Sequence, residues 1–233
     1  MRAIILAAGM GTRLRPLTLT TPKSLIEINN ITLIERQILF LKEIGIDEII
    51  VVTGYLADKF SFLAEKYGVK LIYNDKYNVY NNFYTMYLVR EFLSDAYVID
   101  ADNYLFDNFL DAKITCSTYF SAYKIGFKNE WLLKTDSKNR VKEIIVSSGE
   151  GSIMSGVSYW DKRTGEFLQN ILEEKFYEGE FADLYWDDLV KDYISNITVY
   201  KRDIPTNSIF EVDNLDDLQN LREYCCDASF PKC

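Results

Sequence analysis

The chain has 233 residues, 48% of them hydrophobic, which is enough to bury the core of one domain. Its formal net charge of −9 comes from 26 basic and 35 acidic residues spread along the chain, and this charge argues against a nucleic acid as a partner. The sequence contains no histidine, which excludes histidine bases, histidine metal ligands and nucleophiles activated by histidine, so the chemistry must use carboxylates, lysines, arginines or a hard metal ion.

The first half of the chain alternates apolar runs of strand length with helical patterns. The runs "AIILAA" and "EIIVVTG" are continuous, as in strands that are buried on both faces of a parallel sheet. The expected elements are a strand at Ala3–Ala8, a helix at Leu33–Gly45, a strand at Glu48–Gly54, a helix at about Leu56–Tyr67, a strand at Val69–Tyr73, a helix around Phe83–Phe92 and a strand at Ala96–Asp100. This order predicts an α/β fold with a Rossmann-like, mostly parallel mixed sheet and helices on both faces.

After Asp102 the pattern changes. Three strand-like segments, "STYFSAY", "RVKEIIV" and "SIMSGVSYW", are separated by the polar stretches "TDSKN" and "SSGEG", which we interpret as turns. These segments predict a small β-rich extension of the sheet. The remaining expected elements are helices near Lys162–Glu174 and Trp186–Tyr193, a strand near Ile197–Lys201 and a last helix near Leu215–Tyr224.

The stretch "LAAGMGTRLRP" follows the first expected strand, at the sheet edge where open α/β folds bind ligands. Gly9 and Gly11 allow backbone N–H groups to approach an anion closely, and Thr12 and Arg13 add side-chain donors. Lys23, in "TPKSL", can fold back over the same edge and neutralise charge on a transferring phosphoryl group. The pattern lacks the GK[ST] of a P-loop and the third glycine of a dinucleotide site. A plain glycine turn with solvated arginines is the alternative interpretation.

The longer pattern "LAAGMGTRLRPLT…TPKSLIEI" resembles the signature of the nucleotidyltransferases that make NDP-sugars and CDP-alcohols. The stretches "NDKYNVYNNFYTMYLV", "YVIDADNYLF", "NEWLL", "LYWDDLVKD" and "SIFEVDNLDDL" resemble most the bacterial CTP:phosphocholine cytidylyltransferases. The resemblance implies that the phosphate of phosphocholine attacks the α-phosphorus of CTP with the help of Mg²⁺, which gives CDP-choline and pyrophosphate. It also implies one domain over residues 1–233. The half at about 1–115 would bind the nucleotide, and the half at about 116–233 would bind the acceptor and supply the remaining metal ligands.

The predicted catalytic residues are Lys23 and Arg13. Asn81 and Asn82 can present carbonyl and amide groups to a pyrimidine edge, although asparagines before a helix are also common caps. The predicted nucleotide-binding residues are Leu6, Ala8, Gly9, Gly11, Thr12, Arg13, Lys23, Asn81 and Asn82.

Two acidic groups are candidate ligands for Mg²⁺, which prefers carboxylate oxygens, phosphates and water. By resemblance, Asp102 matches the metal-binding aspartate of the family, and Glu211 and Asp213 match its second acidic group. Ala101 stands where the family more often has glycine, a change that removes no ligand. The alternatives are a solvated strand end for the neighbouring Asp100 and a helix cap for Glu211 and Asp213. A phosphomonoester is already anionic at neutral pH, so the reaction needs no histidine base.

A quaternary ammonium has no N–H to donate, and it is recognised by aromatic faces and nearby negative charge. Trp131 lies beside Glu130, and Tyr185 and Trp186 precede Asp187. We therefore predict that Trp131, Tyr185, Trp186 and Asp187 form the choline site. With 17 tyrosines and 14 phenylalanines in the chain, core packing is the alternative for any one aromatic side chain.

Two other functions remain open. One keeps the fold and the metal but uses a sugar 1-phosphate as the acceptor. The other is a catalytically silent nucleotide-binding module, against which the presence of Lys23 with both acidic groups argues, because sensing a nucleotide needs no transition-state cation.

The sequence also carries an expectation about compartment. Its four cysteines lack the spacing of a zinc site, and we expect reduced thiols. The stretch Met1–Ala8 is too short for a signal peptide or a membrane span. We therefore expect a cytoplasmic protein that does not insert into a membrane.

Overall fold

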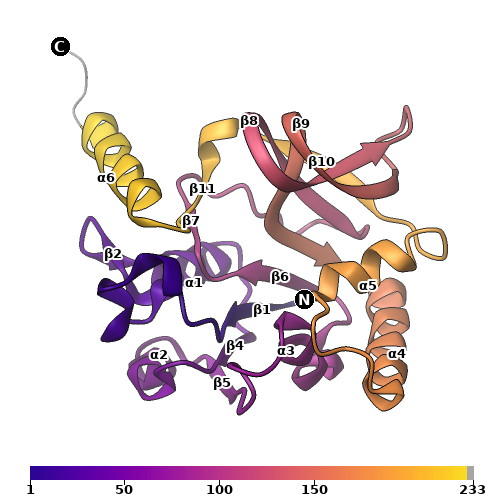
Figure 1. Ribbon diagram of the computed structural model, residues 1–233, viewed down its shortest axis with the longest axis horizontal. Helices are drawn as coiled ribbons and strands as arrows, with labels where there is room; N and C mark the ends of the chain where they lie inside the picture. The colour runs from indigo at the N-terminus through magenta and orange to yellow at the C-terminus, as the bar shows by residue number, and fades with distance from the viewer. Residues whose placement is uncertain (230–233) are drawn as a thin grey trace.

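A seven-stranded mixed sheet runs through the part of the chain that the computed structural model describes, residues 1–229 (Figure 1). Cys233, the last of the four cysteines, lies outside the described residues. The strand order is β10-β8-β9-β6-β1-β4-β5. The strands are β1 (Arg2–Ala7), β4 (Ile49–Thr53), β5 (Lys70–Tyr73), β6 (Ala96–Asp100), β8 (Thr118–Thr135), β9 (Val141–Trp160) and β10 (Tyr200–Ile204).

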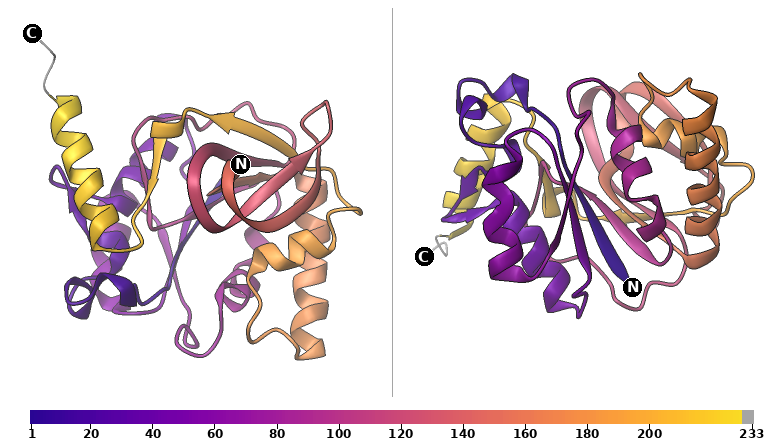
Figure 2. Two further views of the ribbon diagram at one scale, coloured as in Figure 1. Left: turned by 45° about the horizontal axis from the view of Figure 1, so that its top comes forward. Right: turned by 90° about the horizontal axis from the view of Figure 1, so that it is seen from below.

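The parallel part of the sheet is the part that the apolar runs predict. β1 pairs in parallel with both β4 and β6, and β4 pairs in parallel with β5. Ala3, Ile4 and Ile5 of β1 are completely buried, because helices cover both faces of the sheet (Figure 2). The helices are α1 (Leu33–Glu43), α2 (Ser61–Tyr67), α3 (Asn82–Leu88), α4 (Lys162–Glu178), α5 (Trp186–Asp192) and α6 (Leu215–Ser229).

The two faces of the sheet have separate cores. α1 and α2 pack on one face, where Ile38 and Leu63 contribute to the core. α3, α4 and α5 pack on the other face, where Phe83, Leu168 and Leu189 contribute. The expected α/β fold with a mostly parallel mixed sheet and helices on both faces is confirmed.

The expectation of three separate strands between residues 117 and 160 is wrong. β8 and β9 form one long antiparallel hairpin, whose turn lies at the predicted "TDSKN". The stretch "SSGEG" lies inside β9, where Gly149 and Gly151 have positive φ values of 126° and 151° and bend the strand without ending it. Leu132 faces both Ile145 and Ile153, so the ribbon curls back on itself.

Two short sheets complete the fold. β7 (Asn103–Leu105) pairs antiparallel with β11 (Ile209–Glu211), and β2 (Glu27–Ile28) pairs with β3 (Ile31–Thr32). Figure 1 shows β7 and β11 between α6 and the main sheet. α6 packs on the loops of the first half of the chain through Leu218, which belongs to a core cluster with Leu14.

Several expected boundaries differ from the structure. The helix expected at Leu56–Tyr67 begins as a 3-10 turn at Ala57–Phe60, and Leu56, with a left-handed φ of 51°, lies before it. The strand expected at Ile197–Lys201 lies later, at β10. Among residues 1–229, no helix is both long and apolar enough to cross a bilayer.

Candidate active site

The loop after β1 folds around Gly11. Gly11 has φ 57°, and its carbonyl accepts hydrogen bonds from the Leu14 N–H at 3.0 Å and the Thr18 hydroxyl at 2.8 Å. A Cβ at this position would lie 3.0 Å from the Cβ of Lys23. The loop therefore requires glycine both for its left-handed conformation and for its close approach to the lysine. A Cβ at Gly9 would meet no atom within 4 Å.

This loop lines a cavity of about 230 Å³, which we call the loop cavity. It brings most of the predicted nucleotide-binding residues together with two of the predicted metal ligands. Ala8 lies at its edge, where its carbonyl accepts a hydrogen bond from the Tyr55 N–H at 3.1 Å. The predicted residues that line the cavity are Leu6, Gly9, Gly11, Thr12, Arg13, Lys23, Asp102 and Asp213.

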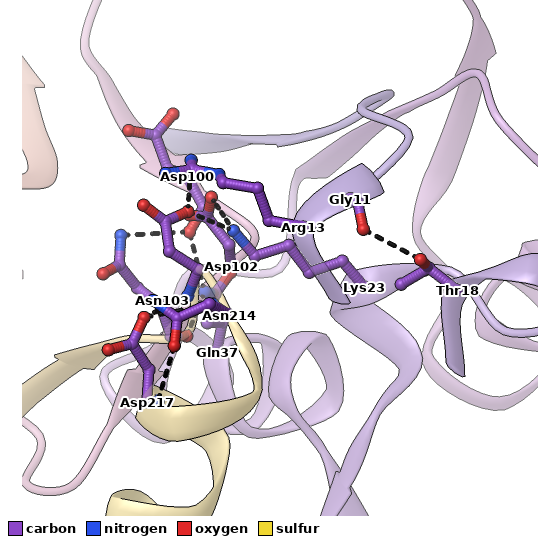
Figure 3. Close-up of polar contacts among 11 residues, drawn as sticks. Gly11, Arg13, Thr18, Lys23, Gln37, Asp100, Asp102, Asn103, Asn214 and Asp217 are labelled. Atoms are coloured by element: carbon purple, nitrogen blue, oxygen red, sulfur yellow. Dashed lines mark hydrogen bonds and ion pairs between the residues drawn. The ribbon is translucent and has the colours of Figure 1, made fainter. Parts of the chain in front are cut away.

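Lys23 is the centre of a charge cluster (Figure 3). Its Nζ lies 2.9 Å from Asp102 Oδ2 and 2.8 Å from Asp213 Oδ1, and Arg13 Nη2 also lies 2.8 Å from Asp213 Oδ1. Burial lowers the pKa of Lys23, but the charges and hydrogen bonds of Asp102 and Asp213 outweigh it, so this pKa is raised above its usual value. Lys23 is therefore a fixed cation at the edge of the sheet.

The three predicted metal ligands are neighbours in space. Carboxylate oxygens of Asp102, Glu211 and Asp213 all lie within 4.8 Å of one another. The pairing of β7 with β11 causes this, because it sets Asn103 opposite Glu211, and the Val212 N–H donates to the Asp102 carbonyl at 3.1 Å. The pairing thereby brings Asp102, just before β7, next to Glu211 and Asp213, at and just after the end of β11, although they lie about 110 residues apart in the chain.

The hydrogen bonds at the start of α6 show which residue caps this helix. Asn214 Oδ1 accepts from the backbone N–H groups of Asp216 and Asp217 at 2.9 and 3.0 Å. Asn214 therefore caps the helix, and the Asp213 carboxylate is left to face Lys23 and Arg13.

Two carboxylates at this edge, those of Asp100 and Glu211, have raised pKa values. Burial, followed by the charges of Asp102, Asp187 and Glu211, holds the pKa of Asp100 well above its usual range. Burial, followed by the charges of Asp102 and Asp213, raises the pKa of Glu211 to about 8, although solvent reaches part of this side chain. A cluster of oxygen ligands with excess negative charge has the donor chemistry that fits a hard divalent cation.

A second cavity, of about 290 Å³, opens beside the first, and we call it the acceptor cavity. It contains all four residues predicted for the choline site: Trp131 from β8, Tyr185 before α5, and Trp186 and Asp187 from α5. The two cavities share Arg13, Asp102 and Asp213. The cluster of cations and carboxylates therefore lies at the junction of the two cavities.

The three aromatic residues predicted for the choline site differ in burial. Trp186 is 2% exposed and packs edge-on against Trp160, with ring centroids 5.4 Å apart, so it belongs to both the cavity wall and the core. Tyr185 is 50% exposed. Trp131 is half-buried, and the Lys191 ammonium lies 5.8 Å from its ring centroid. The cavity thus offers aromatic surface at several depths.

Asp187 is held by a residue that the sequence did not single out. The Tyr119 hydroxyl donates to Asp187 Oδ1 at 2.7 Å. Burial, followed by the charge of Asp188, raises the pKa of Asp187 to about 7, although the hydrogen bond from Tyr119 opposes the shift. Tyr119 occupies an ordinary strand pattern, so no local signal distinguishes it from the other tyrosines.

Other lining residues come from β9 and were also missed. Gly156 has φ 72°, and a Cβ there would lie 2.4 Å from Asn103 Nδ2 and 2.9 Å from Asp100 Oδ2. A glycine inside a strand pattern indicates a close approach, and that signal was present in "SGVSYW". The missed lining residues are Val98, Asn103, Tyr119, Met154, Ser155, Gly156, Val157 and Ser158.

The two asparagines predicted to read the base lie beside the acceptor cavity. Asn81 Nδ2 donates to the Asp183 carbonyl at 2.7 Å, and Asn82 Oδ1 accepts from the Trp186 N–H at 2.9 Å. Asn82 lines the acceptor cavity, and neither residue lines the loop cavity. Both therefore hold the segment that leads into α5, and contact with a base stays a prediction.

Comparisons with known proteins identify the family of the chain. A family model of the MobA-like NTP transferase domain matches residues 3–96. The chain is 52% identical to the choline-phosphate cytidylyltransferase of Streptococcus pneumoniae, over 96% of this chain and 97% of that protein. It is 31% identical to the 2-aminoethylphosphonate cytidylyltransferase of Lancefieldella rimae, over 93% of this chain and 89% of that protein.

A solved structure is similar over the same extent. The CTP:phosphocholine cytidylyltransferase from Streptococcus pneumoniae superposes with a TM-score of 0.94 at 52% identity, covering 96% of this chain and 98% of that chain. The likeness thus extends over nearly the whole of both chains. The chain belongs to the nucleotidyltransferase family that contains the choline-phosphate cytidylyltransferases.

Proposed function

We propose that this protein transfers the cytidylyl group of CTP to phosphocholine, giving CDP-choline and pyrophosphate. One observation carries the proposal: the loop cavity and the acceptor cavity meet at Arg13, Asp102 and Asp213. A phosphate in one cavity and a phosphate in the other would therefore face each other across a cluster that contains both cations and carboxylates. The relationship to choline-phosphate cytidylyltransferases supports the choice of substrates.

In the proposed reaction, a phosphate oxygen of phosphocholine forms a bond to the α-phosphorus of CTP. The bond between the α-phosphorus and the oxygen that bridges to the β-phosphate breaks, and pyrophosphate leaves with that electron pair. The nucleophile is already an anion, so no residue has to remove a proton. The enzyme must instead align two anions and offset their repulsion. We propose that Lys23 and Arg13, which both contact Asp213, supply this positive charge.

We propose that Asp102, Glu211 and Asp213 hold Mg²⁺. Their oxygen ligands, within 4.8 Å of one another, suit this ion. Bound Mg²⁺ neutralises negative charge on the phosphates. The charge of Lys23 and Arg13 adds to that effect at the same edge of the sheet.

The acceptor cavity suits a quaternary ammonium. In the proposed site, Trp131, Tyr185 and Trp186 line the cavity and offer aromatic surface, and Asp187 offers a carboxylate that would balance the charge of the cation. In this role Tyr119 holds the Asp187 carboxylate in place through its hydroxyl.

The backbone of the loop at Gly9, Gly11 and Thr12 is the proposed cradle of the CTP phosphates. We propose that Leu6, which lines the loop cavity, and Ala8, at its edge, support this cradle next to the end of β1. For Asn81 and Asn82, each side chain uses one half of its amide in a bond to the backbone, and we propose that the other half reads cytosine. We place the reaction in the cytoplasm, where the cysteines would stay reduced.

The test is turnover of CTP with a panel of acceptors, followed by pyrophosphate release. The panel contains phosphocholine, phosphoethanolamine, 2-aminoethylphosphonate and glucose 1-phosphate. We expect the highest kcat/KM with phosphocholine, because primary ammonium groups need hydrogen-bond acceptors that an aromatic wall supplies poorly. A preference for glucose 1-phosphate would assign a sugar acceptor. Pyrophosphate release that is independent of every acceptor, or none at all, would contradict the proposal.

A further inference from the structure

Gln37 is a fully buried polar side chain that lies behind the carboxylate cluster. It belongs to α1, and its exposed fraction is 0%. Its neighbours on the helix, Ile34 and Ile38, belong to the hydrophobic core. An amide in such surroundings loses its hydration, so its hydrogen bonds have to serve a structural or functional purpose.

The amide of Gln37 spans the turn that carries Asp102. Its Nε2 donates to the Asp100 carbonyl at 3.0 Å and to the Asn103 carbonyl at 2.7 Å. These two carbonyls lie on either side of Ala101 and Asp102, and Figure 3 shows Gln37 beneath this turn. The opposite orientation of the amide would set its oxygen against two carbonyl oxygens, so the orientation is fixed by chemistry.

The other end of the amide shows that this arrangement is not explained by packing alone. Gln37 Oε1 is buried and has no hydrogen-bond partner among the described residues. An apolar side chain of the same length would fill the space without leaving an unpaired acceptor. What such a side chain could not supply is the pair of N–H bonds to the turn.

The helix that carries Gln37 is itself firmly held. α1 begins with a capping box between Thr32 and Glu35. Glu35 Oε1 also accepts from Lys66 Nζ at 2.8 Å and from the Tyr67 hydroxyl at 2.9 Å, which ties α1 to the end of α2. A donor on this helix is therefore a fixed reference point for the turn.

We propose that Gln37 is a positioning residue for the cation site, which it serves by fixing the turn that presents Asp102 toward Glu211 and Asp213. The turn is short and lies between two strands, so a change in its backbone would move the Asp102 carboxylate relative to the other two. This inference rests on the proposed metal site. It requires that loss of the two hydrogen bonds weakens cation binding through Asp102.

Arg36, the residue before Gln37 on α1, offers a matched control. Its side chain also donates to backbone carbonyls, but these lie at the end of β7 and just after it. Its guanidinium donates to the carbonyls of Leu105 and Phe106, the latter at 2.6 Å, and its charge lies 4.7 Å from the ring centroid of Phe40. Arg36→Met removes the hydrogen bonds from this side chain to the backbone at the end of β7, and it leaves the hydrogen bonds to the turn at Asp102 in place.

The experiment measures binding of Mn²⁺ to the ligand-free full-length chain by electron paramagnetic resonance. For Gln37→Met we expect a Kd for Mn²⁺ that is about tenfold higher, on the scale of losing an outer-shell partner of a metal ligand. For Arg36→Met we expect less than about a twofold change. Gln37→Leu is the second variant if Gln37→Met does not fold, and thermal unfolding is recorded for all variants.

A double-mutant cycle distinguishes positioning from general stability. In an Asp102→Asn background, Gln37→Met should change the Kd for Mn²⁺ by less than about twofold, because the ligand through which it acts has gone. An undiminished effect in that background, an unchanged Kd in Gln37→Met, or an equal effect of Arg36→Met would overturn the inference. A wild type that binds no Mn²⁺ would also overturn it. If the wild type binds Mn²⁺ but makes no CDP-choline, the proposed function fails, and the cycle still decides the role of Gln37.

Discussion

Lys23 contacts both acidic groups of the site, and this gives the first prediction at the residue scale. Its ammonium lies within 2.9 Å of Asp102 and Asp213, at the junction of the two cavities. Lys23→Ala should lower kcat by roughly two to three orders of magnitude, on the scale of removing a preorganised electrostatic stabiliser. Steady-state kinetics with saturating CTP and phosphocholine measure it. Lys59→Ala, on the 3-10 turn before α2, is the control, and an equal loss in both variants would contradict the assignment.

The aromatic wall gives a second residue-scale prediction. A cation over an aromatic face gains about 0.5 to 2 kcal/mol, so Trp131→Ala or Tyr185→Ala should raise the KM for phosphocholine by roughly several-fold to tens-fold. The KM for CTP should barely change. Tyr185→Phe should have a milder effect, because it keeps the ring. Tyr177→Ala, at an exposed tyrosine of α4, is the control. An equal rise in both KM values would assign these aromatics to the core.

The raised pKa of Asp187 predicts that the KM for phosphocholine depends on pH. Burial raises its pKa to about 7, and a bound quaternary ammonium favours its ionised form. The KM for phosphocholine should therefore fall as pH rises through about 7, in addition to any change caused by titration of the substrate phosphate. Asp187→Asn cannot ionise at this position, so its profile should keep the titration of the substrate phosphate and of other site groups such as Glu211 but lose the change near pH 7. The comparison of the two KM profiles isolates this residue, and identical profiles would contradict its role.

The same group affects folding, with a definite sign. In the unfolded chain Asp187 has its ordinary pKa of 3.8, so between that value and about 7 the folded protein holds a proton that the unfolded chain has released. Its contribution to the free energy of unfolding therefore decreases as pH rises from about 4 to 7. Urea unfolding across this range should show a shallower decrease for Asp187→Asn than for the wild type. A parallel pair of curves would count against the raised pKa.

At the scale of elements, two glycines of the β8–β9 hairpin allow the cost of a left-handed backbone to be measured separately from the cost of a close contact. Gly156 and Gly126 have similar φ values of 72° and 75°, but a Cβ at Gly156 would lie 2.4 Å from Asn103 Nδ2, whereas a Cβ at Gly126 would meet no atom within 4 Å. Both changes to alanine should cost about 1 to 2 kcal/mol through the left-handed backbone.

Gly156→Ala should in addition displace Asn103 and Asp100 and lower kcat. Gly126→Ala should leave kcat close to that of the wild type. Chemical denaturation and steady-state kinetics on the two variants measure the difference. If both variants lose activity equally, the close contact at Gly156 has no specific effect on kcat.

The elements also show where prediction from sequence stops. β1, β4 and β6 could be predicted because strands buried on both faces have continuous apolar runs. The curl of β8 and β9 could not, because a glycine-rich stretch inside a bent strand has the same local pattern as a turn.

The same limit applies to the site residues. Lys23 and Asp102 could be placed because they follow strands at the ligand-binding edge, and Tyr119 could not, because its partner Asp187 lies 68 residues away. Pairings of this kind depend on tertiary structure. The sequence indicated which residue types the chemistry needed, and the fold determined which individual residues meet.

At the scale of the whole molecule, the central claim is that a phosphate oxygen of the acceptor is the nucleophile that forms the new bond to the α-phosphorus of CTP. The measurement that tests this claim most directly uses phosphocholine whose phosphate oxygens are labelled with the heavy isotope of oxygen, and phosphorus NMR of the product. Attack by the acceptor phosphate predicts CDP-choline with a labelled oxygen between its two phosphorus atoms, so the isotope shifts the signals of both. An unlabelled bridging oxygen, or a product other than CDP-choline, would contradict the account.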